Sequence, residues 1–305
     1  MFSQKTIILG NGFDLDLGLK TSYRHFINSP QYSELIESSK FIRDECNLFK
    51  IIEKDSKIET WGGVEASLLD YVKRFQSHID EPTARMTYFF HSGLENGIAE
   101  YLRNISYDNI RTESCAAYLL RKMLGGGMFN YYSFNYTDVN KVFNTNSNCV
   151  KYIHGTLDGK NTILGVQDEA IQDRLAFVKK SHHFNYSSKD FISDMLNSKH
   201  ILIFGHSMCL SDKEYFTTLF KDCKSPNHKC ERITFIVHER SDVADIMSNI
   251  EKLSGLNMSA IQEKITIDYN FTSSFYFEDV KVTKKTIDDF FEPQGWFLMP
   301  SGRSV

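Results

Sequence analysis

Two side chains that could orient water and accept a proton follow short apolar runs of the chain. Asn135 lies in SFNYTD, at the end of the run Phe129–Phe134, and His154 lies in YIHGT, after the run Val150–Ile153. An asparagine amide donates and accepts hydrogen bonds at once, so Asn135 could orient a water molecule and a ligand hydroxyl. An imidazole can accept a proton near neutral pH, so His154 is a candidate general base. The alternatives are an asparagine that only turns the chain and a structural histidine with satisfied hydrogen bonds.

The first apolar run ends in a glycine loop. Thr6–Leu9 leads into Gly10–Gly12 (GNG), just before a helix-like segment. Glycines can adopt positive φ and let a ligand approach the backbone, and the N–H groups at a helix start attract an anion. Leu15 stands where a G-x-G-x-x-G fingerprint needs its third glycine, so a plain tight turn is the alternative. Asp14 could bind a ligand hydroxyl, or it could cap the helix.

A second loop of this kind is FGHSMCLSDKEYF, after the run His200–Phe204. Gly205 and Ser207 predict another close approach to a ligand, and Asp212 stands where a helix could begin. For Ser207 and Asp212 the alternative is helix capping. Open α/β sheets bind ligands at the carboxyl ends of their strands, so these loops are expected to meet at one site.

The elements that must position these residues are buried strands and amphipathic helices. Five runs predict strands, namely Thr6–Leu9, Phe129–Phe134, Val150–Ile153, His200–Phe204 and Ile233–Val237, and Lys264–Tyr269 is a weaker sixth. Apolar residues three and four apart predict helices between the first and second runs. We therefore expect an α/β protein with a Rossmann-like, mostly parallel sheet. Its core would comprise residues 1–28 and 124–305, with a helical insertion over residues 29–123 that is a lid, an oligomer interface or both.

Composition narrows the class of protein. The chain has 305 residues and a formal net charge of -4, which argues against coating nucleic acid. Six scattered cysteines and the absence of a signal-like leader predict reduced thiols and a cytoplasmic location. No apolar run approaches the roughly 18 residues needed to span a bilayer, so no membrane partner is expected. Cys223, His228 and Cys230 lack the spacing typical of a zinc site.

These motifs, in this order, resemble the bacteriophage abortive-infection AbiH family over most of the chain. The resemblance is carried by GNGFDLDLGLKTSY, SFNYTD, YIHG followed by ILG (Ile163–Gly165), and GHSMCLSDKEYF, with WGGVE (Trp61–Glu65) similar to a Trp-x-x-x-Glu segment of that family. The same order is similar to the wider sirtuin-like superfamily. Gly10 and Gly12 match the first two glycines of its NAD pocket, and Gly18 matches a later one. Asn135 matches the asparagine near the nicotinamide ribose, and His154 matches the catalytic histidine.

The resemblance implies an antiviral protein that binds NAD as substrate and hydrolyses it to nicotinamide and ADP-ribose. It implies catalytic roles for Asn135 and His154. The cofactor-binding residues that it suggests are Gly10, Asn11, Gly12, Phe13, Asp14, Thr21, Gly205, His206, Ser207 and Asp212. The zinc ribbon of the deacetylases is absent, so no metal is expected. A homo-oligomer or a defence partner protein is compatible with this assignment.

This sequence also departs from the superfamily pattern. Asn11 and Asp14 replace the usual alanine and serine, and Lys20-Thr21 replaces a proline-containing turn. Lost catalysis would make the protein a sensor that binds a nucleotide or NAD derivative without turnover, which is the first alternative. A nuclease or other nucleic-acid effector ranks third, because acids that could hold metal ions are not clustered. A serine hydrolase is weaker still, because GHSMC has Cys209 where a nucleophile elbow needs glycine.

Overall fold

A single parallel sheet forms the centre of the protein. The computed structural model describes residues 5–55, 61–75, 79–125, 129–147, 149–157, 162–166, 171–183, 186–273 and 277–292. The strands are β1 (Lys5–Leu9), β2 (Asn130–Ser133), β3 (Val150–Tyr152), β4 (His200–Phe204), β5 (Arg232–Val237) and β6 (Thr266–Phe271). Their order is β3-β2-β1-β4-β5-β6, and every pairing is parallel. This confirms the predicted Rossmann-like sheet, in which the strand order reverses between β1 and β4.

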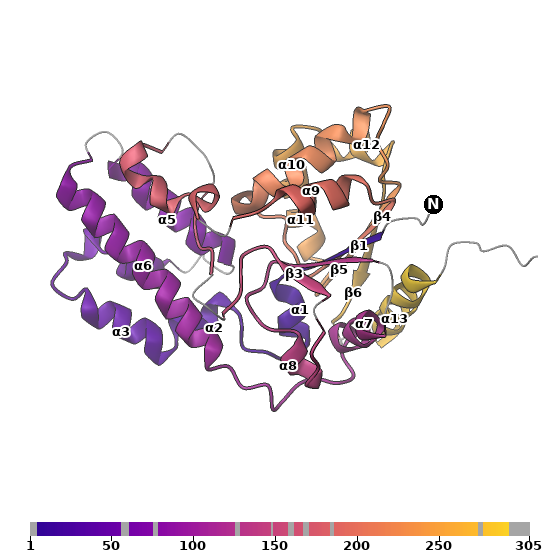
Figure 1. The fold of residues 1–305 in the computed structure, drawn as a ribbon, viewed down its shortest axis with the longest axis horizontal. Helices are drawn as coiled ribbons and strands as arrows, with labels where there is room; N and C mark the ends of the chain where they lie inside the picture. The colour runs from indigo at the N-terminus through magenta and orange to yellow at the C-terminus, as the bar shows by residue number, and fades with distance from the viewer. Residues whose placement is uncertain are drawn as a thin grey trace, which may run out of the picture.

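Both faces of the sheet are covered, which is why its strands read as continuous apolar runs. Successive residues of a strand point to opposite faces. Ile8 and Ile203 pack with α9 (Lys189–Leu196), α10 (Lys213–Lys221), α11 (Asp242–Ser254) and α12 (Met258–Gln262). Leu9 and Leu202 pack with α1 (Asn11–Asp16), α7 (Cys115–Leu124), α8 (Asn140–Phe143) and α13 (Phe277–Phe291). Figure 1 shows these two layers of helices above and below the sheet.

The remaining helices form a separate helical lobe, which we define by its own apolar core. It contains α2 (Tyr23–Ile27), α3 (Pro30–Ser38), α4 (Leu48–Lys54), α5 (Trp61–Phe75) and α6 (Glu81–Arg103). These helices lie to one side of the sheet domain in Figure 1. The lobe core also takes Leu164, Leu175 and Val178 from the segment after β3, whereas α7 packs on the sheet. The lobe is thus built from two separate stretches of chain.

Polar residues fix where the lobe helices begin. The Ser22 hydroxyl accepts the N–H of His25 at α2, and the Ser29 hydroxyl accepts the N–H of Tyr32 at α3. Asp80 does the same for Thr83 at α6. Proline in the first turn of α3 and α6 needs no N–H partner there. These caps satisfy backbone N–H groups at the starts of α2, α3 and α6.

Short 3₁₀ turns complete the fold: η1 (Asp44–Cys46), η2 (Asp173–Val178), η3 (Lys180–His182), η4 (Leu210–Asp212) and η5 (Asp222–Lys224). All six cysteines are unpaired. Among the helices described here, none is both long enough and apolar enough to cross a membrane.

Candidate active site at the carboxyl edge of the sheet

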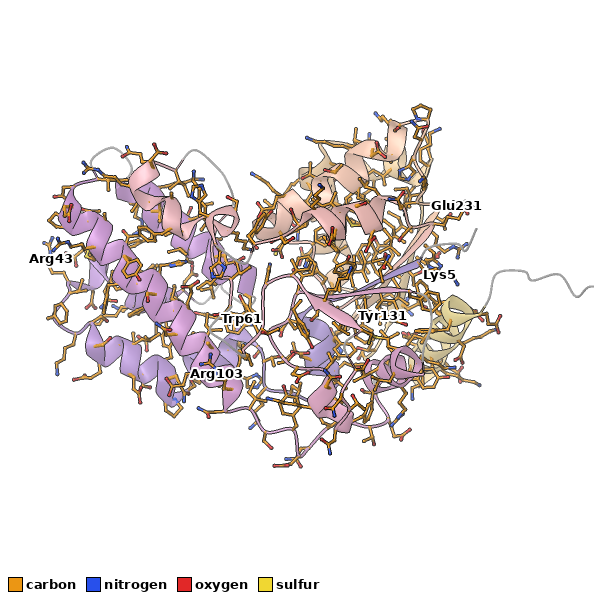
Figure 2. All side chains as sticks on the ribbon, in the orientation of Figure 1. Lys5, Arg43, Trp61, Arg103, Tyr131 and Glu231 are labelled. Carbon is orange, nitrogen blue, oxygen red and sulfur yellow. The ribbon has the colours of Figure 1, made fainter. Side chains whose placement is uncertain are left out.

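A cavity of about 410 Å³ lies where the carboxyl ends of the strands meet the helical lobe. Its sheet side comes from the loops after β1, β2, β3, β4 and β5, and its lobe side includes residues of α5 and α6. Trp61, at the start of α5, stands between the two parts of the molecule in Figure 2. Asn135 and His154 both line this cavity, so the two candidate catalytic residues are brought to one site.

Asn135 is held by its amide nitrogen. Its Nδ2 donates to the backbone oxygen of Gly10 at 2.9 Å and to Oδ1 of Asp14 at 3.0 Å. Both partners are acceptors, so the amide must place its nitrogen toward them. No hydrogen bond from the described residues is recorded for its Oδ1, which leaves that oxygen as an acceptor for a ligand or water.

Asp14 is a buried carboxyl group whose charge is only partly compensated. Thr137 Oγ1 donates to its Oδ2 at 2.6 Å, and Asn135 donates to the other oxygen. Burial raises the pKa of Asp14 to about 7, although these two hydrogen bonds favour the ionised form and lower it. The Asp14 side chain makes no capping bond at the start of α1. Asp14 can therefore exchange a proton near neutral pH, which is a property of functional sites.

His154 and His206 face the two oxygens of one carboxylate. His154 Nε2 lies 3.2 Å from Oδ1 of Asp212, and His206 Nε2 lies 3.3 Å from Oδ2. The Met208 N–H donates to Nδ1 of His206 at 3.0 Å, so the proton of a neutral His206 ring is on Nε2. The contact from His154 is close enough for an ion pair, but its geometry does not make a hydrogen bond. The carboxylate still favours a proton on Nε2 of His154, which leaves Nδ1 as its acceptor nitrogen.

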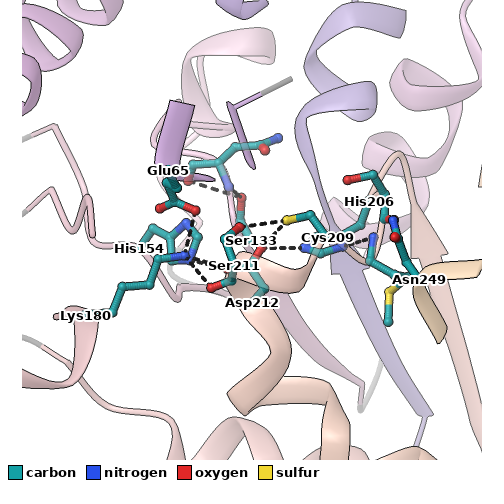
Figure 3. Close-up of polar contacts among 12 residues, drawn as sticks. Glu65, Ser133, His154, Lys180, His206, Cys209, Ser211, Asp212 and Asn249 are labelled. Carbon is teal, nitrogen blue, oxygen red and sulfur yellow. Dashed lines mark hydrogen bonds and ion pairs between the residues drawn. The ribbon is translucent and has the colours of Figure 1, made fainter. Parts of the chain in front are cut away.

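A buried lysine holds this carboxylate in place. The fully buried Lys180 Nζ lies 2.8 Å from Oδ1 of Asp212, 3.0 Å from Oε2 of Glu65 and 3.0 Å from the backbone oxygen of Ser211. Figure 3 shows these contacts converging from three parts of the chain. Burial alone lowers the pKa of Lys180, but Asp212 and Glu65 more than offset this and hold it well above its ordinary value. We call Glu65, Lys180 and Asp212 the ion cluster.

The ion cluster is electrically unbalanced. It sets two carboxylates against one ammonium, so it carries one excess negative charge when both neighbouring imidazoles are neutral. Burial raises the pKa of Asp212, yet Lys180 and His154 lower it well below its ordinary value, and Asp212 stays ionised. A cation that forms in the cavity would be stabilised by this charge. Asp212 forms no side-chain cap on α10, and its carboxylate instead contacts Lys180, the two histidines and the Cys209 thiol.

The glycines of the two loops are required by packing between the loops. A Cβ on Gly12 would lie 2.6 Å from Cα of Gly205, and one on Gly10 would lie 2.7 Å from the Gly205 oxygen. Gly205 alone of the three has a positive φ, at 65°, so the expectation that positive φ explains Gly10 and Gly12 is wrong. The Gly12 N–H donates to Gly205 O at 2.9 Å, and the Phe13 N–H donates to Gly10 O at 2.9 Å. These two N–H groups are already bonded within the protein.

Some of the other candidate residues line the cavity and some do not. Asn11, Thr21, Ser207 and His206 line the cavity, but Gly10 and Phe13 are outside its lining. The Phe13 ring is fully buried against Phe204, with ring centroids 5.4 Å apart. A direct side-chain contact between Phe13 and a ligand in this cavity has no support from this placement.

Sequence reasoning missed the central role of Lys180. Its immediate neighbours, Lys179 and Ser181, are polar, and nothing in the stretch VKKSHH distinguishes a buried lysine from an exposed one. Glu65 is singled out by the sequence only as part of the WGGVE segment, which opens α5 and indicates no partner for it. Cys223 and Cys230 are buried in the apolar core, and His228 bonds the Cys230 oxygen at 2.8 Å. The described residues contain no group of three or more His, Cys, Asp or Glu side chains able to hold a metal ion.

Comparison with known proteins identifies the family. The family model described as "Bacteriophage abortive infection AbiH" matches residues 6–88 and 71–237, which together span most of the chain and include the loops after β1, β2, β3 and β4. No curated protein matches the sequence. The chain therefore belongs to the bacteriophage abortive infection family AbiH, and its role is in phage abortive infection.

Proposed function

We propose that the cavity binds NAD and hydrolyses the bond between nicotinamide and its ribose, releasing nicotinamide and ADP-ribose. The observation that carries this proposal is that Asn135, His154 and Asp14 line one cavity where the strand order reverses between β1 and β4. Nucleotides bind open α/β sheets at this position. One buried polar atom of the lining, Thr21 Oγ1, has no hydrogen-bond partner among the described residues, which fits a polar ligand.

The surroundings suit a reaction that develops positive charge. Cleavage of the glycosidic bond sends its electron pair to nicotinamide, which leaves neutral, and the ribose passes through an oxocarbenium-like state. The excess negative charge of the ion cluster would stabilise that state electrostatically. The ionised form of Asp14 would add to this stabilisation, because the Asp14 carboxyl lies in the wall of the same cavity.

Water completes the reaction by bonding to the anomeric carbon. Asn135 Oδ1 would orient that water or a ribose hydroxyl, because its Nδ2 is held by Gly10 and Asp14. His154 Nδ1 would accept the proton that the water loses. The atoms balance as NAD plus water giving nicotinamide, ADP-ribose and one proton.

The pyrophosphate would bind to side chains more than to the glycine loop. The Gly12 and Phe13 N–H groups already donate within the protein. Asn11 and Ser207 line the cavity on the two adjacent loops and carry groups that can donate to phosphate oxygens. No lysine or arginine is among the described residues that line the cavity, so phosphate contacts there would be made by neutral donors.

The test is release of nicotinamide from NAD by purified protein, followed by chromatography. We expect His154→Ala to lower the rate by about 10²-fold or more, as loss of a general base does, and Asn135→Ala to lower it as well. His182→Ala and Asn197→Ala are matched controls, because both residues are exposed and lie outside the cavity lining. Activity that survives both cavity substitutions would overturn the assignment.

If the purified protein is inactive, the same four variants are tested in phage-infected cells, and the cellular NAD content is measured. Unchanged NAD during infection would overturn hydrolysis. Calorimetry distinguishes the alternative: NAD or ADP-ribose that binds without product formation would assign a sensor.

A further inference from the structure

One hydroxyl group in the cavity wall is buried without a partner. Thr21 is 2 % exposed and lines the cavity, and its Oγ1 makes no hydrogen bond with the described residues. A buried polar atom left unpaired costs free energy, and native proteins rarely keep one without a reason. Since Thr21 lines the cavity, a ligand bound there can supply the missing hydrogen bond.

The backbone on either side of this hydroxyl is hydrogen-bonded by two helices of the helical lobe. Trp61 Nε1 on α5 donates to the backbone oxygen of Thr21 at 2.8 Å. The Tyr101 hydroxyl on α6 donates to the backbone oxygen of Lys20 at 2.6 Å. Two aromatic donors therefore fix consecutive carbonyl groups of the segment between α1 and α2. The position of Thr21 is set before any ligand arrives, as a recognition group requires.

The cavity wall supplied by the lobe is apolar and aromatic. Trp61, Ile98, Leu102 and Leu164 line the cavity together with Tyr136, and all five belong to or pack against the apolar core of the lobe. The Tyr136 ring lies 6.1 Å from the His154 ring, centroid to centroid, so this wall adjoins the proposed site of bond cleavage. The Tyr136 hydroxyl donates to the backbone oxygen of Ile163 at 2.8 Å. Flat apolar walls with one polar group suit a planar heteroaromatic ring.

We infer that this wall takes the nicotinamide ring and that Thr21 Oγ1 hydrogen-bonds its carboxamide. The inference rests on the proposed function and names the group with which the helical lobe recognises the substrate. A threonine hydroxyl can donate to the carboxamide oxygen or accept from its nitrogen. Adenine is the other planar ring of NAD, and the arms of the test separate the two.

The test compares Thr21→Val with Thr21→Ser. Valine has the shape of threonine without its hydroxyl, and serine keeps the hydroxyl. By calorimetry with nicotinamide and with NAD, we expect Thr21→Val to weaken binding by about 5- to 150-fold and Thr21→Ser to stay within about threefold of wild type. Adenosine affinity stays unchanged in both variants. In NAD hydrolysis we expect Thr21→Val to raise KM and leave kcat unchanged, because the hydrogen bond to the carboxamide forms before the chemical step.

A melting measurement separates recognition from folding. Since Thr21 Oγ1 has no bond within the described protein, Thr21→Val melts no lower than wild type. Thr137→Val is the comparison, because the Thr137 hydroxyl donates to Asp14 at 2.6 Å and its loss lowers the melting temperature.

The outcomes are distinct. Unchanged affinity of Thr21→Val for nicotinamide and NAD overturns the inference and leaves NAD hydrolysis standing. Nicotinamide binding that depends on Thr21, with no hydrolysis of NAD by the purified protein or in infected cells, supports the inference and overturns the proposed function. A selective effect on adenosine, a lower melting temperature of Thr21→Val, or a wild type that binds neither nicotinamide nor NAD also overturns the inference.

Discussion

Replacing Lys180 with methionine removes the positive charge of the ion cluster and leaves a side chain of similar length. At an effective dielectric constant of about 20, an ammonium group 2.8 to 3.0 Å from a carboxylate is attracted by about 5 to 6 kcal/mol, before the cost of desolvation. Lys180→Met leaves Glu65 and Asp212 buried without this partner. Breaking a buried pair from one side costs about 3 to 5 kcal/mol, and we expect a loss of stability in this range at pH 8.

The loss depends on pH in a defined direction. In the wild type, Lys180 and His154 hold the pKa of Asp212 below its unfolded value, so its stabilisation is present above that value and is lost as pH falls through the folded pKa. In Lys180→Met, the ammonium group that lowers the pKa of Asp212 is gone, so burial, which raises that pKa, has more weight. The folded variant then binds protons more readily than the unfolded chain, so its deficit shrinks as pH falls.

Urea unfolding at pH 5 and pH 8, followed by circular dichroism, measures both effects. The Glu65→Gln/Lys180→Met double variant should be more stable than Lys180→Met alone, because one unpaired charge is removed. Lys199→Met is the control, since the Lys199–Glu231 pair is exposed and worth less than about 1 kcal/mol. A loss for Lys180→Met below about 1 kcal/mol at pH 8, or an equal loss at both pH values, would refute the reasoning.

Two further predictions concern Gly205 and Asp14. Gly205→Ala combines a φ of 65° with a Cβ only 2.4 Å from Cα of Gly12, so we expect a loss of more than about 4 kcal/mol, whereas Gly255→Ala has a similar φ and open space and should cost about 1 kcal/mol. Similar melting temperatures for the two variants would contradict loop packing as the reason for Gly205. Asp14, with a folded pKa of about 7 against about 3.9 unfolded, makes stability fall as pH rises between those values, so Asp14→Asn should flatten the dependence of the unfolding free energy between pH 5 and pH 7. An unchanged slope in urea unfolding would show that Asp14 does not titrate there.

The sheet and the position of the cavity could be predicted because they depend on local patterns. Each strand is buried on both faces and so reads as an apolar run, and parallel strands bring their carboxyl ends to one edge. Asn135 and His154 could be chosen because each follows such a run. Their presence in one cavity follows from that shared edge.

The ion cluster could not be predicted, because its members meet only through the tertiary fold. Lys180 comes from the segment after β3, Glu65 from the middle of α5, and Asp212 from the loop after β4. A lysine in a polar stretch is expected to be exposed. Lys180 is buried only because the lobe packs against the sheet. The glycines of the GNG loop were found for the wrong reason, since contact with Gly205 explains them and a positive φ does not.

The order of the strands also determines when a newly synthesised chain can acquire its site. The first strand to be synthesised, β1, lies between β2 and β4 in the sheet. Thr6 therefore cannot pair on either side until Asn130 and Ile201 have been synthesised. The apolar core of the lobe is likewise incomplete until Leu175 and Val178 have been synthesised. Pairings between such distant segments form slowly and late. A ribosome that stops before Asp212 therefore releases a fragment that lacks the acidic partner of both histidines, and the cavity arises only near the end of synthesis.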